Sequence, residues 1–250
     1  GVTNEMLSRA ILKNRLPVGF YEGLTNLEVL GIFGACYKLA VFMTLAVQAL
    51  RYAFEPFFFA QAKEKNSPQV FSQVMTWFVA FTSFSWLILS VFMPYYAPIF
   101  LRQESYLMAL NAVPWLLGGG LFLGVFYNLS LWYKLTDKTR YGAMISIVGA
   151  ITTFLLNWLL IPIYGYMGSA FATFGSYLLM VAISYAWGMR HYPVPYQVFK
   201  VMAYIILAGA GIVIDGLTQQ SFLKAVLIVL IFLTLPLLLE RKALQRLKNQ

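Results

Sequence analysis

The residues from Ile32 to Lys65 read IFGACYKLAVFMTLAVQALRYAFEPFFFAQAKEK, a stretch apolar and long enough to cross a bilayer as one helix. Because this run exceeds what a hydrocarbon core of roughly 30 Å needs, we expect the helix to tilt, to bend at Pro56 or to project beyond the membrane. Four polar or ionisable residues interrupt it: Lys38, Gln48, Arg51 and Glu55. Such side chains are costly at membrane depth and usually face a cavity or a partner, so the segment predicts that something polar is handled within the membrane.

The composition is that of an all-α integral membrane protein. The 250 residues are 60% hydrophobic and 11% charged, with a mean hydropathy of +0.72, whereas soluble domains contain about 25% charged residues. The net charge of +9 is spread over short gaps between apolar runs, which argues against nucleic acid as a partner and favours a topology signal. With one cysteine, Cys36, and one histidine, His191, we expect no internal disulfide, no histidine metal cluster and no cofactor.

Apolar segments recur along the chain at a length suited to membrane spans of about 20 residues. An amphipathic run from Gly1 ends at Pro17, and because it lacks an initiator methionine we expect a longer protein upstream. Counting this run as a truncated first helix, we expect about eight transmembrane helices. The seven further segments are Leu30–Ala62, Val70–Met93, Tyr106–Tyr133, Tyr141–Ile161, Met167–Met189, Val198–Ile214 and Phe222–Leu239.

Basic residues fall in every second gap between these segments, which predicts the orientation of the chain. The alternate gaps, at 16–29, 94–105, 162–166 and 215–221, carry few or no basic residues. Because cytoplasmic loops carry an excess of lysine and arginine, we expect the basic gaps and the C-terminus to be cytoplasmic. These basic gaps are Lys63–Lys65, Lys134–Arg140, Arg190–Lys200 and Arg241–Lys248.

A polar stripe runs along the long helix. Thr44, Gln48, Arg51 and Glu55 follow i, i+4, i+7 and i+11, which places them on one helical face. If Lys63 marks the cytoplasmic surface, Arg51 lies about 18 Å into the membrane at helical rise. We interpret the stripe as the lining of a binding cavity for an anionic ligand. The alternative is a structural ion pair between Arg51 and Glu55 at i, i+4.

Three further residues of the first helix are candidates for the same cavity. Glu5, Arg9 and Lys13 are spaced at i, i+4 and i+8, and Arg9 lies about 12 Å before Pro17 at helical rise. We therefore expect Arg9 and Lys13 to line one cationic cavity together with the stripe. Glu5, Thr44 and Lys38 are possible further residues of that cavity. Lys38 lies close to the opposite interface, where it can snorkel instead. With no catalytic constellation in view, we do not expect an enzyme.

The glycines of one central segment predict close helix packing. Gly118, Gly119 and Gly120 are followed by Gly124, which forms a small-xxx-small pattern. Pro114, just upstream, allows that helix to bend.

Two stretches resemble a known transporter group. The residues Asn157 to Ser176 read NWLLIPIYGYMGSAFATFGS, which combines a helix end, a Pro/Gly turn and a second helix that begins with small residues. This stretch resembles a recurrent segment of polysaccharide and O-antigen flippases, which belong to the multidrug/oligosaccharidyl-lipid/polysaccharide exporter superfamily. The run from Arg51 to Lys63 is similar to the matching position of bacterial members.

The resemblance implies a fold and a function for the chain. Such proteins resemble two bundles of six helices, and residues 1–190 then match the second bundle with its first helix truncated. Residues 191–250 match two additional C-terminal helices and a basic cytoplasmic tail. The implied activity is to flip a polyprenyl-pyrophosphate-linked oligosaccharide across the bacterial inner membrane by alternating access, for polysaccharide or lipopolysaccharide biosynthesis. The implied partners are this substrate, membrane lipids and the missing N-terminal half.

Other functions remain open from the sequence. A multidrug or metabolite antiporter of the same superfamily would favour carboxylates in the cavity, of which the first two helices offer Glu5 and Glu55. A membrane-embedded polysaccharide polymerase or glycosyltransferase would require a large exterior loop or paired carboxylates. A structural membrane scaffold would leave the stripe through Arg51 unexplained.

Overall fold

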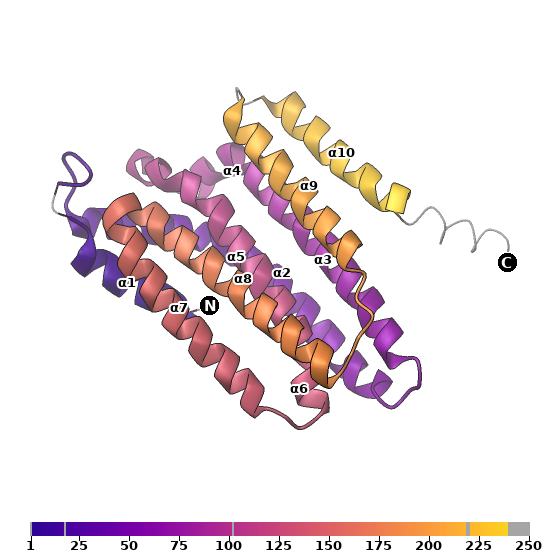
Figure 1. The fold of residues 1–250 in the computed structure, drawn as a ribbon. Coiled ribbons are helices and arrows are strands. Elements are labelled where there is room, and N and C mark those ends of the chain that lie inside the picture. The colour runs from indigo at the N-terminus through magenta and orange to yellow at the C-terminus, as the bar shows by residue number, and fades with distance from the viewer. Residues whose placement is uncertain (1, 18, 102, 219–220, 240–250) are drawn as a thin grey trace.

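The structure is a computed structural model that describes residues 2–17, 19–101, 103–218 and 221–239, and every regular element in these ranges is a helix (Figure 1). The all-α class expected from the composition is therefore confirmed. The elements in chain order are α1 (Val2–Arg15), α2 (Asn26–Gln61), α3 (Ser67–Val91), α4 (Met93–Phe100), η1 (Glu104–Ala112), α5 (Val113–Leu129), α6 (Leu131–Leu135), α7 (Arg140–Tyr164), α8 (Tyr166–His191), α9 (Val198–Leu217) and α10 (Phe222–Leu239).

Among the residues that the structure describes, six stretches are long and apolar enough to cross a membrane, as in a multi-pass membrane protein. They are α2, α3, the joined stretch Glu104–Leu135, α7, α8 and α9. α1 has only 14 residues, and the described part of α10 contains a shorter apolar helix, Phe222–Thr234. Each of the seven apolar segments found in the sequence is helical, while the total of eight spans stays a prediction.

Some helices are interrupted where the sequence predicts one continuous membrane span. The segment 106–133 was expected as one helix, but it divides into the 3-10 helix η1 and the helices α5 and α6. Pro114 lies in the first turn of α5, where its missing N–H costs no helical hydrogen bond. The gap at 94–105 contains most of the short helix α4, and α2 continues through Pro56 to Gln61.

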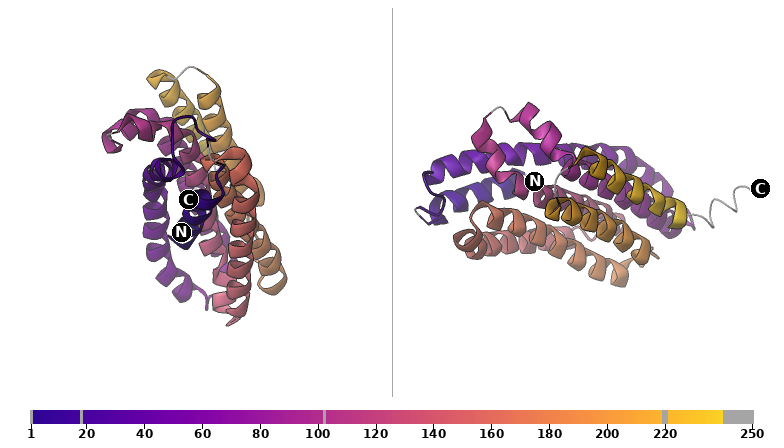
Figure 2. Two further views of the ribbon diagram at one scale, coloured as in Figure 1. Left: turned by 90° about the vertical axis from the view of Figure 1, so that its left-hand side faces the viewer. Right: turned by 90° about the horizontal axis from the view of Figure 1, so that it is seen from above.

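Helix α5 lies at the centre of the bundle. It packs against α2, α3 and α8, and outside these lie α7 on α8, α9 on α3 and α10 on α9 (Figures 1 and 2). The connections alternate between two ends of the molecule (Figure 1). We call the end with the α2–α3, α6–α7 and α8–α9 connections the basic end, because Lys63, Lys134–Arg140 and Arg190 lie there, and the other the opposite end.

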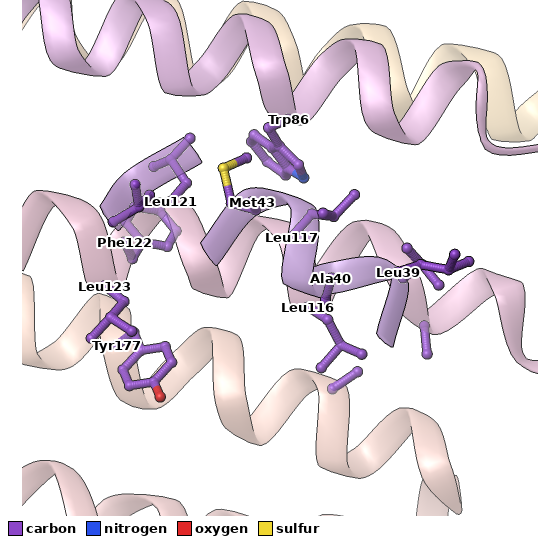
Figure 3. Close-up of a cluster of buried hydrophobic side chains, with 14 of the residues drawn as sticks. Leu39, Ala40, Met43, Trp86, Leu116, Leu117, Leu121, Phe122, Leu123 and Tyr177 are labelled. Carbon is purple, nitrogen blue, oxygen red and sulfur yellow. The ribbon is translucent and has the colours of Figure 1, made fainter. Parts of the chain in front are cut away.

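The glycines of α5 bring its neighbours close on several sides. A Cβ atom at Gly119 would lie 3.2 Å from Thr173 of α8, and one at Gly120 would lie 2.8 Å from Met43 of α2. One at Gly124 would lie 2.8 Å from Phe78 of α3. The packing role predicted for these glycines is therefore present, although on several faces of the helix rather than one. Figure 3 shows the apolar side chains between α5 and its neighbours, among them Leu117, Leu121, Met43, Trp86 and Tyr177.

The Pro/Gly turn between α7 and α8 is a tight reversal. α7 ends at Tyr164, and Gly165 takes φ +59° and ψ −136°, a conformation that residues other than glycine rarely adopt. Three residues later, a Cβ atom at Gly168 would overlap the backbone of Leu160 and Ile161. The two helices therefore meet backbone to backbone at this point.

We expect Gly168→Ala to destabilise the protein, because the Leu160 carbonyl belongs to a helix and cannot move aside as a side chain can. Overpacking of about 1–3 kcal/mol or more predicts a fall of roughly 5 °C in the midpoint of thermal unfolding in detergent. The control is Gly31→Ala on α2, where a Cβ atom would meet nothing within 4 Å, so its midpoint should stay or rise. Equal midpoints for both variants would contradict this account of the turn.

Candidate functional site

The polar stripe of α2 lies at the boundary between its buried and its exposed face. Met43 and Val47 are buried in the core, whereas Leu45 and Tyr52 are 59% and 69% exposed. Between these faces the Arg51 and Glu55 side chains are 32% and 28% exposed. Both charges can therefore reach neighbouring helices without leaving the bundle.

Glu55 is the shared partner of two cations. Lys134 Nζ donates a hydrogen bond of 2.6 Å to Glu55 Oε1, and Arg51 Nε lies 3.5 Å from Glu55 Oε2. The guanidinium of Arg51 lies over the ring of Tyr127, 4.5 Å from its centroid. We call Arg51, Glu55, Lys134 and Tyr127 the ion cluster. The i, i+4 pair predicted between Arg51 and Glu55 is present, and Lys134 is an addition that sequence reasoning missed.

A break between α5 and α6 positions Lys134. α5 ends at Leu129, and the Ser130 hydroxyl donates a hydrogen bond of 2.5 Å to the Tyr127 carbonyl. The single turn of α6 then carries Lys134 to the side of α2. From the sequence alone, Lys134 was identified only as the first residue of the basic gap 134–140. No spacing rule connects it with Glu55, since the two residues are 79 positions apart.

The ion cluster encloses little free space but retains positive charge. Its cavity of about 20 Å³ can hold roughly one water molecule. Two cations and one carboxylate leave a formal charge of +1 within the cluster. Arginine and lysine bind phosphate oxygens strongly when they are partly removed from water, so the cluster is chemically suited to an anion. The cavity is lined by Val47, Arg51, Phe54, Glu55, Phe58, Phe78, Gly124, Tyr127, Asn128, Leu131 and Lys134.

The other two members of the stripe lie nearer the middle of α2. Gln48 is half-buried, and its Oε1 atom is buried with no hydrogen-bond partner among the described residues. A buried amide oxygen of this kind can accept a hydrogen bond from a ligand or from water. Thr44 is exposed.

Arg9 and Lys13 of α1 do not join the ion cluster. The Arg9 guanidinium packs on α2 at Gly34, where a Cβ atom would lie 2.9 Å from Arg9 Nη2. Gly34 precedes Arg51 by 17 residues (51 − 34), or about 26 Å at helical rise. Arg9 and Arg51 therefore do not line one cavity in this structure. Lys13 is exposed, and the Glu5 side chain lies outside the described side chains.

Lys38 lies apart from the ion cluster as well. It is exposed and lines a cavity of about 390 Å³ with Gln103 and Tyr106, next to the connection that follows α4. This position at the opposite end agrees with the interfacial location that its depth predicts.

Comparisons with known proteins give no match from which a function of the site could be inferred. No family model, no curated protein and no solved structure matches the chain. Within the part of the chain that the structure describes, no group of three or more His, Cys, Asp or Glu side chains could hold a metal ion. The candidate site is therefore described by its own contacts, a charged cluster between α2 and the stretch Glu104–Leu135, both of which are long and apolar enough to cross a membrane.

A double-mutant cycle tests the link between α2 and α6. We expect a coupling free energy of about 1–2 kcal/mol between Glu55→Gln and Lys134→Gln, less than for a fully buried ion pair because both side chains are partly exposed. The measurement is chemical unfolding in detergent micelles. Lys63→Gln, an exposed lysine at the same end, is the control partner and should show coupling near zero. Equal coupling in both cycles would show that the contact contributes nothing specific.

Proposed function

We propose that the chain forms the second bundle of a transporter that moves polyprenyl-pyrophosphate-linked oligosaccharide across the bacterial inner membrane by alternating access. In this proposal its eight helices comprise six of the bundle and two at the C-terminus, with the basic end in the cytoplasm. The helical architecture and the resemblance carried by Asn157–Ser176 support the proposal.

The observation that carries the proposal is the positive charge of the ion cluster, which lies between α2 and the stretch Glu104–Leu135, both long and apolar enough to cross a membrane. Arg51 and Lys134 both bind the Glu55 carboxylate, whose oxygens are the same kind of acceptor as those of a diphosphate. A diphosphate can therefore replace Glu55 on both cations. Until it does so, Glu55 acts as an internal counter-ion that neutralises part of the charge.

The position of the ion cluster suits a substrate that arrives from the basic end. Glu55 and Arg51 lie about 12 and 18 Å from Lys63 at helical rise, so the cluster is reached before the centre of the bundle. Because its cavity has room for about one water molecule, substrate binding requires the side chains of α2 and α6 to separate. The bound diphosphate would then supply the negative charge that Glu55 gives up.

A cation antiporter is less well supported. Such a protein would bind its cargo or its coupling ion through an uncompensated carboxylate. Glu55 already contacts two cations, and the formal charge of the ion cluster is positive rather than negative.

We expect Arg51→Ala in the full-length protein to lower surface glycan by at least about tenfold while protein levels stay normal. The variant leaves Glu55 and Lys134 as a neutral pair, so the fold persists while the ion cluster loses its net charge. The measurement is surface glycan in cells that depend on this transporter, with membrane protein quantified in parallel.

Arg15→Ala is the matched control. The Arg15 guanidinium also lies over an aromatic ring, 3.8 Å from the centroid of Trp158, but near the opposite end. This variant should produce normal glycan. Normal glycan with Arg51→Ala at wild-type protein level would refute the role given to the ion cluster, and transport of cationic dyes without any glycan phenotype on deletion would support the antiporter instead.

A further inference from the structure

We propose that a second site, at the opposite end, binds a membrane phospholipid that has a primary ammonium head group. The site is a cavity of about 780 Å³ between α9, the segment formed by α3, α4, η1 and α5, and Phe174 of α8. This volume lies within the range of about 300–1,000 Å³ that is typical of ligand sites. Most of its lining is apolar, including Trp86, Val91, Pro98, Leu107, Phe174 and Ile212.

The cavity follows from how α9 packs. α3 and α9 lie side by side (Figure 1) and both run from the basic end to the opposite end. Gly211 meets Leu87, because a Cβ atom there would lie 3.0 Å from Leu87 Cδ1. One helical turn further on, Ser90 and Asp215 are therefore at the same level, and both line the cavity.

Polar groups of the lining include two that are almost fully buried. Ser90 is 5% exposed, and its Oγ atom has no hydrogen-bond partner in the described structure. Asp215 is 8% exposed, and its Oδ1 atom lies 3.0 Å from Lys224 Nζ. Lys224 also donates to the Asp215 carbonyl and to Thr218 Oγ1. These groups lie near the end of α9, where the lipid head-group region is expected, while Trp86 and Gly209 lie deeper along the same two helices.

The chemistry of this lining selects the occupant. An empty apolar cavity of this size forfeits dispersion contacts, and apolar walls give water too few polar partners to fill it well. Lipid is the apolar molecule that surrounds a membrane protein, so hydrocarbon fills the part against Trp86. Ser90 and Asp215 offer acceptor oxygens to the cavity, and Lys224, which is not part of the lining, contacts the Asp215 carboxylate through its Oδ1 atom. A primary ammonium head group can donate to Ser90 Oγ and to the Asp215 carboxylate, whereas a quaternary head group lacks the N–H donors.

Tryptophan fluorescence tests the hydrocarbon part. Two variants are compared, one whose only tryptophan is Trp86 and one whose only tryptophan is Trp132. The probe is phosphatidylethanolamine with acyl chains brominated close to the head group. We expect it to quench the fluorescence of Trp86 at least about threefold more than that of Trp132. Both side chains are buried, at 7% and 3% exposure, but Trp132 does not line the cavity. Equal quenching of the two would overturn the site.

Two further measurements, on chains that keep all their tryptophans, test which lipid binds and whether filling the cavity prevents binding. Native mass spectrometry should show phosphatidylethanolamine bound in preference to phosphatidylcholine by about threefold or more, and Asp215→Asn should abolish that preference. Gly209→Phe, which fills the space beside Trp86, should remove the bound lipid. Equal retention of the two lipids by the native chain, or unchanged lipid in Gly209→Phe, would refute the proposal. None of these outcomes depends on glycan transport.

Discussion

The close approach of α2 to α5 is the constraint on which the rest of the structure depends. In lipid there is little hydrophobic driving force between helices, so small residues that let backbones approach set the packing. Gly120 admits Met43, and Gly124 admits Val47. The same parallel register then brings Tyr127 to Arg51 and Lys134 to Glu55. The ion cluster thus lies in line with the contacts that Gly120 and Gly124 make with α2, on the side nearer the basic end.

The electrostatics of the ion cluster explain how charges persist on a membrane-spanning helix. Glu55 neutralises one cation, and the ring of Tyr127 stabilises the guanidinium of Arg51. Either cation can be lost without leaving an unpaired charge, whereas loss of Glu55 would leave two cations facing each other. A purely structural pair would need only one cation for the carboxylate. The second cation gives the cluster its formal charge of +1, which is the charge that the proposed anionic ligand would use.

Local patterns in the sequence were enough to predict some features and not others. Hydropathy located the seven apolar segments, but not the short helix α4 or the division of 106–133. The i, i+4 spacing identified the Arg51–Glu55 pair because both residues lie within one helix. Lys134 was missed because its partnership depends on how α6 turns back toward α2. Depth along each helix placed Arg9 and Arg51 in one cavity, but depth says nothing about position around the bundle. The cavity beside α9 has no sequence signal, since it depends on the spacing between helices far apart in the chain.

The two proposed sites share one rigid element. Gly124 lines the cavity of the ion cluster, while Trp86 and Phe174, which line the cavity beside α9, pack directly on Gly118. These glycines are six residues apart on α5 (124 − 118), or about 9 Å at helical rise. Such short-range contacts tolerate little displacement, because close-packed interiors transmit strain rather than absorb it. If the side chains of α2 and α6 separate to admit a diphosphate, the contacts of α5 with α3 and α8 would hold α5 in place.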